Sequence, residues 1–174
     1  MPNLTEEQKK ILDPVFSSPT APLTDDLQQI IAQHRVCLHE LQRARFVKPC
    51  DWQLDYQAGP GLLLSHLQKA RELSRIALLR ARLRFAARET DAALSDLLAV
   101  FKMARDCGAS PVLISFLVQV AIEKSATDLL AAHLPLLNTE QLDQVSAALR
   151  DLPAPSSLSM LVLAEEHLFV DWLE

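Results

Sequence analysis

The sequence predicts an all-α fold: antiparallel helical hairpins, with six or seven helices in a bundle or a short right-handed solenoid of tetratricopeptide-like type. Leu (33) and Ala (22) are abundant, whereas Val, Ile and Thr together supply 22 of the 174 residues. Leu and Ala lose little side-chain freedom in a helix, while strands favour β-branched residues. Only 3 glycines are present, and apolar residues recur at helical spacing over most of the chain.

The length and the apolar content predict one helical domain with a short N-terminal extension. A chain of 174 residues with 49% apolar residues can bury a sizeable core without disulfides or metals. We expect residues 1–23 to form a short helix and a proline-rich arm, and residues 24–174 to form the domain.

The first helices are marked by caps and prolines. Thr5 followed by Gln8 predicts a capping box for a short helix that ends before Pro14, because proline cannot continue the hydrogen-bond ladder. A second helix is expected from the cap at Thr24 to about Phe46. Pro49 ends it, and residues 49–61 form the clear non-helical connection within the domain.

The longest periodic stretch, residues 62–88, predicts a central helix with neighbours on two sides. One apolar face holds Leu63, Leu67, Ala70, Ala77, Leu78, Ala81 and Phe85, and a roughly opposite face holds Ile76, Leu79, Leu83 and Ala86. The basic residues lie in the gaps between these faces: Arg71, Arg75 and Arg82 on one flank, and Lys69, Arg80 and Arg84 on the other. These flanks are interpreted as solvated, with an anion-binding or partner-binding surface as the alternative.

Four further signals divide the second half into helices. A helix starts at Thr90 and Asp91 and stops at a left-handed Gly108. The next starts at Ser110 and Pro111 and ends before Pro135. Asn138 with Gln141 caps another helix, to about Leu152, and Ser156 or Ser157 opens the last, to Trp172. Short connections force neighbouring helices to pack antiparallel. Residues 87–104 resemble the turn and second helix of a tetratricopeptide repeat, without a second copy at the expected period.

Two apolar stretches could contact a membrane or a partner protein. The run 111–122 is too short and too interrupted to span a membrane and is interpreted as a buried core helix. The terminal helix carries Leu163, Phe169, Val170, Trp172 and Leu173. If these side chains are exposed they form a partner or self-association surface, and if they are buried they close the core.

Charge and cysteine usage exclude several classes of protein. A net charge of −5 argues against nucleic acid as a partner. Cys37, Cys50 and Cys107 are odd in number and lack CxxC spacing, which indicates buried free thiols in a reducing compartment. The first ten residues hold no apolar stretch typical of a signal peptide. A cytoplasmic location is the default expectation.

The connection at residues 49–61 holds the most functional-looking cluster, Asp51, Trp52, Asp55 and Tyr56. Two carboxylates in one cleft can act as an acid/base pair, because their repulsion raises one pKa. The alternative is that the aspartates cap turns while the aromatic rings cover the core. With His66, Arg71 and Arg75, this cluster is the candidate ligand or partner surface.

Motifs for catalysis and for cofactors are missing. The chain has no GxSxG, glycine-rich phosphate loop, HExxH or CxxC. His34 with Cys37, and His167 with Asp171, lack the further ligands that a zinc site requires. We therefore expect no catalytic, cofactor-binding or metal-binding residues.

The residues also carry a family resemblance. The segments 49–83, 89–106 and 110–126 resemble an uncharacterised family of helical proteins from planctomycetes, acidobacteria and verrucomicrobia, over roughly residues 24–153. The most specific part is the loop with Cys50, Asp55, Tyr56 and Gly59, which leads into Leu63 and His66 and is followed later by Leu113, Ile114, Ser115, Leu117 and Val118. The resemblance brings no activity, cofactor or catalytic residue. Proteins that resemble this one often carry an N-terminal membrane anchor or export segment, which this sequence lacks. Either this is a bacterial envelope protein without its anchor in this sequence, or the resemblance misleads about location.

The expected function is a non-catalytic interaction or scaffold module that holds a peptide or a partner helix in a groove between helix pairs. The alternative is a small-ligand-binding protein or an enzyme with a pocket near residues 49–61. The oligomeric state is left open by the sequence.

Overall fold

The structure is a computed structural model that describes residues 4–17, 24–48 and 50–173. Over these ranges it contains eight α-helices and two short 3-10 helices, with no strand. The all-α prediction is confirmed, and the expected number of helices, six or seven, was too low. The bounds are α1 Glu6–Ser17, α2 Asp25–Gln33, α3 Arg35–Ala44, η1 Tyr56–Gly61, α4 Ser65–Ala86, α5 Thr90–Gly108, α6 Leu113–His133, η2 Leu134–Leu136, α7 Thr139–Arg150 and α8 Leu158–Leu173.

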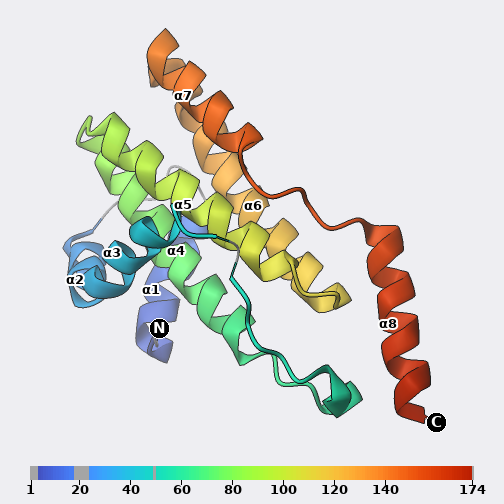
Figure 1. The fold of residues 1–174 in the computed structure, drawn as a ribbon. Coiled ribbons are helices and arrows are strands. Elements are labelled where there is room, and N and C mark those ends of the chain that lie inside the picture. Colours follow the sequence, from blue (N-terminus) through green and yellow to red (C-terminus); the bar gives the residue numbers. More distant parts are fainter. Residues whose placement is uncertain (1–3, 18–23, 49, 174) are drawn as a thin grey trace.

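Helices α4, α5 and α6 form the centre of the bundle. Helix α5 packs against α4 and α6, and α4 also contacts α6. Helices α2 and α3 cover one side of this centre, α7 packs on α5, and α8 lies beside the bundle against η1 and α6 (Figure 1). Because the turns between consecutive central helices are short, neighbours run antiparallel.

The predicted central helix does have neighbours on two sides. Ile76 and Leu79 on one face, and Ala77 and Phe85 on the other, are at most 4% exposed. Each fully buried large side chain of this kind stabilises the fold by roughly 1.5–3 kcal/mol. Leu63 was placed wrongly on this helix: α4 begins at Ser65, and Leu63 is exposed.

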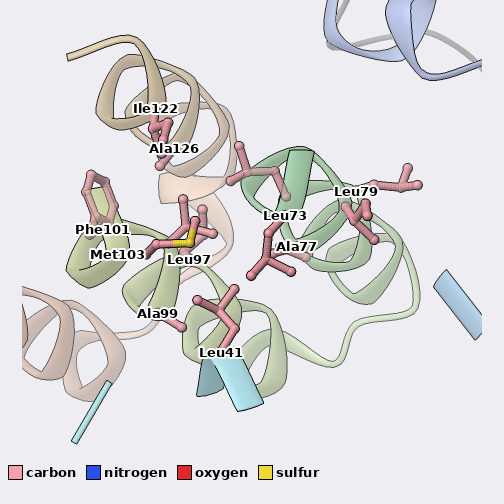
Figure 2. Close-up of a cluster of buried hydrophobic side chains, with 14 of the residues drawn as sticks. Leu41, Leu73, Ala77, Leu79, Leu97, Ala99, Phe101, Met103, Ile122 and Ala126 are labelled. Atoms are coloured by element: carbon pink, nitrogen blue, oxygen red, sulfur yellow. The ribbon is translucent and has the colours of Figure 1, made fainter. Parts of the chain in front are cut away.

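The core is formed where α3, α4, α5 and α6 meet (Figure 2). Side chains from these four helices converge in one apolar cluster, without a polar residue among those drawn. The labelled members are Leu41, Leu73, Ala77, Leu79, Leu97, Ala99, Phe101, Met103, Ile122 and Ala126. Small alanines alternate with leucines there, which lets the helices approach closely.

One flank of the central helix is not solvated as predicted. Arg80 and Arg84 both pair with Asp96, whose side chain is 0% exposed. Arg80 binds both carboxylate oxygens, through Nη2 at 2.5 Å and Nε at 2.9 Å, and Arg84 Nη1 adds a bond of 2.8 Å. Gln42 Nε2 donates a further hydrogen bond of 2.8 Å. These four donor contacts tie α3, α4 and α5 together and compensate the buried charge.

Two predicted boundaries in the N-terminal region were wrong. Helix α1 does not end before Pro14 but continues through it to Ser17, with Leu12 fully buried just before the proline; the rest of the predicted arm, residues 18–23, lies outside the described residues. The helix expected over residues 24–46 is divided at His34. The backbone N–H of His34 bonds Ile31 O, and its ring Nδ1 lies 2.9 Å from Ile30 O. This ring contact does not account for the break, because His167 makes the same contact with Leu163 O inside the unbroken helix α8.

The predicted capping boxes are confirmed, and other predicted caps and helix ends were wrong: Thr24 makes no side-chain cap hydrogen bond, and Val112 rather than Ser110 is the N-cap of α6. Both predicted capping boxes are present, Thr5 with Gln8 and Asn138 with Gln141. Gly108 is not a left-handed stop: it is the last residue of α5, and Ala109 follows in right-handed conformation. Helix α6 begins at Leu113, two residues after the predicted proline.

The predicted buried helix at residues 111–122 is buried on one side only. Ile114, Leu117 and Val120 are 45–52% exposed along the other side of α6. Leu163 and Val170 of α8 are also about half exposed, so this part of the terminal helix is not a closing lid. The side chains of Phe169, Trp172 and Leu173 lie outside the described part of the chain. Within that part, every helix is too short or too polar to cross a lipid bilayer.

Candidate functional site

The two aspartates of the predicted loop cluster act as turn residues. Asp51 Oδ1 accepts a hydrogen bond from the N–H of Gln53 at 2.9 Å, and Asp55 Oδ1 accepts one from the N–H of Gln57 at 3.1 Å. Both aspartates are exposed. An acid/base pair would need both carboxylates in one cleft, so this geometry favours the turn interpretation. Tyr56, the fourth member of the cluster, is half-buried at the start of η1.

Trp52 fixes the loop to the bundle. Its Nε1 donates a hydrogen bond of 2.9 Å to Asp106 O on α5, and its ring stacks on His66 with centroids 4.6 Å apart. His66 Nε2 is buried and has no hydrogen-bond partner among the described atoms. Burial lowers the pKa of His66. A cavity of about 380 Å³ lies between this stack and the loop, with Leu54 and Leu62 in its wall.

The two arginines of the predicted surface lie elsewhere. Arg71 and Arg75 line a separate cavity of about 340 Å³, together with Lys9 and Glu72. Arg75 Nη2 pairs with Asp13 of α1. This cavity shares no lining residue with the loop cavity. The structure therefore divides the seven predicted site residues between two places.

An apolar recess lies over α5. A cavity of about 380 Å³ is enclosed by α3, the segment 50–52 and α5. Its floor is apolar and includes Leu41, Leu73, Ala99 and Met103. Val36 of α3, which is 67% exposed, adds an apolar rim.

A second cavity continues this recess toward α7. It has a volume of about 510 Å³ and lies between α5 and α7. Leu94, Leu98 and Leu152 supply its apolar wall. Arg45 and Lys102 line both cavities, so the two adjoin at these residues. We call the pair of cavities the α5 groove.

Two basic side chains, Lys102 and Arg45, lie at the centre of the α5 groove, and of these only Lys102 is paired with a carboxylate of the described chain. Lys102 Nζ binds both oxygens of Asp106, at 2.6 and 2.7 Å, and both residues are at least 92% buried. Arg45 is half-buried, and burial lowers its pKa. Its guanidinium carbon lies 5.2 Å from the centroid of the Phe46 ring, and within the described residues no carboxylate pairs with it. Phe46 itself is 81% exposed.

Sequence reasoning missed most of this groove. Of the seven predicted site residues only Trp52 lines it. The apolar pair Phe46 and Val47 at a predicted helix end could have indicated an exposed apolar surface there. In the structure these side chains are 81% and 63% exposed. Another signal was Lys102 with Asp106, an ion pair spaced by four residues within an otherwise apolar helix.

The three cysteines occupy different environments, so the expectation that all are buried was wrong. All three are free: Cys107 is buried, Cys37 is half-buried and Cys50 is exposed. Burial raises the pKa of the Cys107 thiol to about 12. Burial also raises the pKa of Cys50, with a smaller contribution from the Asp106 charge. Cys37 and Cys50 line the α5 groove, and the raised pKa of Cys50 disfavours its thiolate.

The α5 groove offers apolar walls and the half-buried Arg45 guanidinium, and the carboxylates of Glu40, Asp91 and Asp151 also lie in its lining. Among the described side chains, no three histidine, cysteine, aspartate or glutamate residues converge as a metal ion requires.

A scan against models of protein families, and searches of curated proteins and of solved structures, found no match for this chain.

Proposed function

We propose that this chain is a non-catalytic interaction module that holds a peptide or a helix of a partner protein in the α5 groove. The observation that supports this proposal best is a pair of adjoining cavities along one helix, about 380 and 510 Å³: the first is mainly apolar, and the second has an apolar wall beside polar residues. Exposed apolar residues lie at the rim. Recesses of this shape accept side chains spaced along a helix or an extended peptide. The half-buried Arg45 between the cavities supplies a polar contact that would orient the ligand.

We also propose that the helices stack as in tetratricopeptide-like proteins, as the sequence predicted. Helix α5 contacts α4 and α6 and also α7, and stacked antiparallel helices of this kind create extended binding surfaces. We further propose that the chain belongs to the uncharacterised bacterial family that it resembles, and that it serves there as a scaffold for a partner protein.

Site-specific photo-crosslinking tests the proposed groove. A photo-crosslinking amino acid replaces Phe46 at the rim, and the matched control replaces Leu136, which is 62% exposed on η2. We expect an adduct to one peptide sequence from Phe46 and none from Leu136. Ala147→Trp should abolish the adduct, because Ala147 is exposed on α7 and lines the larger cavity. Equal adducts at both positions, or an adduct that survives Ala147→Trp, would contradict the proposal.

The alternative, a small-ligand site near residues 49–61, has one specific observation in its favour. The loop cavity ends on the stacked rings of Trp52 and His66, and His66 Nε2 is buried without a partner. A planar small molecule that donates a hydrogen bond to this nitrogen fits the arrangement. Ligand-observed NMR with a fragment library tests it: hits should bind the wild-type chain and not His66→Leu. Equal binding to both would contradict this alternative.

A further inference from the structure

More acidic than basic side chains line the α5 groove. Lys102 and Asp106 neutralise each other through two hydrogen bonds of 2.6 and 2.7 Å. The remaining charged residues of the lining are one base and three acids: Arg45, Glu40, Asp91 and Asp151. The lining therefore has an acidic excess, and a partner that complements it carries basic side chains.

Two of these acids are not neutralised by the chain itself. Glu40 is paired on the surface with Arg43, whose Nη1 lies 3.3 Å from Glu40 Oε1. Asp91 Oδ1 accepts a hydrogen bond of 2.7 Å from the neutral Gln141 side chain. Asp91 and Asp151 are both exposed, and among the described residues no basic side chain pairs with either. Both carboxylates can therefore bind a cationic group of a partner.

These two aspartates lie at opposite ends of the larger cavity. Helices α5 and α7 pack together and run in the same direction (Figure 1), and Gln141 near the start of α7 bonds Asp91 near the start of α5. Asp151 follows Gln141 by ten residues, or roughly 15 Å along the helix axis at 1.5 Å per residue. Leu94 and Leu98 line the same cavity along α5. An apolar wall is thus flanked by a carboxylate at each end.

The helix dipoles make Asp151 the more favourable of the two positions for a cation. Asp151 is the C-cap residue of α7, where the partial negative charge of the helix end opposes a carboxylate. Arg150 precedes it on α7 but does not line the cavity. Asp91 lies in the first turn of α5, where the positive end of the helix already stabilises it. A basic group should therefore gain more beside Asp151 than beside Asp91.

We infer that the partner segment held in the α5 groove is a basic amphipathic helix. Its apolar side chains enter the cavities, and lysine or arginine side chains about three helical turns apart reach Asp91 and Asp151. The inference rests on the proposed function, because it names the chemistry of the ligand of the same groove. Arg45 repels a cation at its own position between the cavities, so the partner places a polar or apolar side chain there.

Selection from a random peptide library tests this chemistry. The peptides have about 15 residues, roughly 22 Å as a helix, and the full chain is the bait. The Ala147→Trp chain, whose larger cavity is filled at an exposed lining position, removes peptides that bind elsewhere. The peptides retained only by the wild type should be enriched in lysine and arginine beside apolar residues at helical spacing.

The outcomes of the selection separate this inference from the proposed function. Groove-dependent peptides that are acidic or uncharged overturn the inference and retain the proposed function, because the groove then binds a ligand of another chemistry. Recovery of the same peptides with the wild type and with Ala147→Trp rejects the groove itself. The photo-adduct at Phe46 is an independent readout of groove occupancy.

Three isosteric variants with the same net charge locate the interaction. The probe is a fluorescein-labelled helical peptide of leucine and lysine, with leucines spaced by three and four residues, and binding is measured by fluorescence anisotropy. Asp151→Asn should weaken binding about three- to fivefold, and Asp91→Asn about twofold, the range for exposed ion pairs. Asp143→Asn, an exposed change on α7 outside both cavities, should leave binding unchanged. Equal weakening in all three variants would mean that only the overall charge attracts the peptide, and would overturn the inference.

Salt and stability measurements complete the test. Raising the salt concentration from about 50 to 500 mM should weaken binding to the wild type more than binding to Asp91→Asn/Asp151→Asn, because screening acts on the ion pairs that the double variant lacks. Equal salt dependence would contradict the inference. Asp151→Asn should unfold at the same urea concentration as the wild type or a higher one, because it removes a charge that opposes the helix dipole. Weaker binding by this variant is then not a result of unfolding.

Discussion

Gln119 on α6 occupies the space beside Gly108 on α5 where a side chain would begin. A Cβ added at residue 108 would lie 2.6 Å from Gln119 Cδ and 3.0 Å from Gln119 Cβ. Gln119 is 1% exposed, and its Nε2 donates to Glu123 Oε1 at 2.9 Å, so it has little room to move. Ser156 Oγ also donates to Gly108 O at 2.6 Å. The glycine is required by close helix packing at this point.

Gly108→Ala should therefore destabilise the fold. We expect a loss of about 1–3 kcal/mol in the free energy of unfolding, the usual cost of overpacking a tight core. The measurement is urea denaturation followed by circular dichroism. Gly108→Ala/Gln119→Ala should recover much of the loss, because the shorter side chain leaves space for the new methyl group. Additive losses in the double variant would contradict the steric explanation.

The buried carboxylate of Asp96 should be far more important than an exposed one. Asp96→Ala leaves Arg80 and Arg84 without their shared partner, and breaking a buried ion pair typically costs about 3–5 kcal/mol. Asp128→Ala is the matched control: Asp128 pairs with Lys124 on the surface, at side-chain exposures of 59% and 73%, and its removal should cost about 1 kcal/mol or less. Denaturation of both variants gives the comparison. Similar losses of unfolding free energy in the two variants would mean that the buried ion pairs of Asp96 with Arg80 and Arg84 do not stabilise the fold more than a surface pair does.

The helices were predictable because their signals are local. Apolar periodicity located α4 and α5, and the capping boxes at Thr5 and Asn138 marked two helix starts. The errors arose where tertiary contacts decide. Gly108 looked like a helix stop in the sequence, but its role depends on Gln119, eleven residues later on another helix. The predicted apolar stripe from Leu27 to Leu41 runs across His34, so periodicity predicted one helix where the structure has two.

The candidate site was less predictable than the fold. Asp51 and Asp55 attracted notice because acidic and aromatic residues cluster in the loop, yet both aspartates serve the local turns. The α5 groove is assembled from α3, α5 and α7, and its lining residues are far apart in the sequence. Arg45 has the same residue type as arginines that form ion pairs elsewhere in this chain. Only the three-dimensional arrangement shows that, among the described residues, no carboxylate pairs with it.

His66 should make the fold less stable in acid. Burial lowers the pKa of His66 in the folded chain below the ordinary value of 6.5. As the pH falls through 6.5, the unfolded chain takes up a proton that the folded chain does not bind, so the free energy of unfolding decreases until the pH passes the folded pKa. This contribution is fully present above pH 6.5.

Urea denaturation between pH 4.5 and 7.5 measures the effect of His66. His66→Gln should lose stability less steeply with falling pH than the wild type over this range, whatever constant offset the lost Trp52 stack produces. His39→Gln is the control, because the His39 side chain is 67% exposed, and it should follow the wild-type slope. Parallel curves for wild type and His66→Gln would reject this assignment.

The cysteines should react in the order of their exposure, Cys50 before Cys37 and Cys107 last. Cys107 is 0% exposed, and burial raises its pKa to about 12, so both access and thiolate formation are suppressed. Iodoacetamide labelling at pH 8, followed by peptide mass spectrometry, should modify Cys50 within minutes and Cys107 only at denaturant concentrations that unfold the chain. Gly108→Ala provides an internal check: by loosening the adjoining α5–α6 contact it should shift the onset of Cys107 labelling to lower urea, in proportion to its lost stability. Rapid labelling of Cys107 in the native wild type would contradict the packing described around α5.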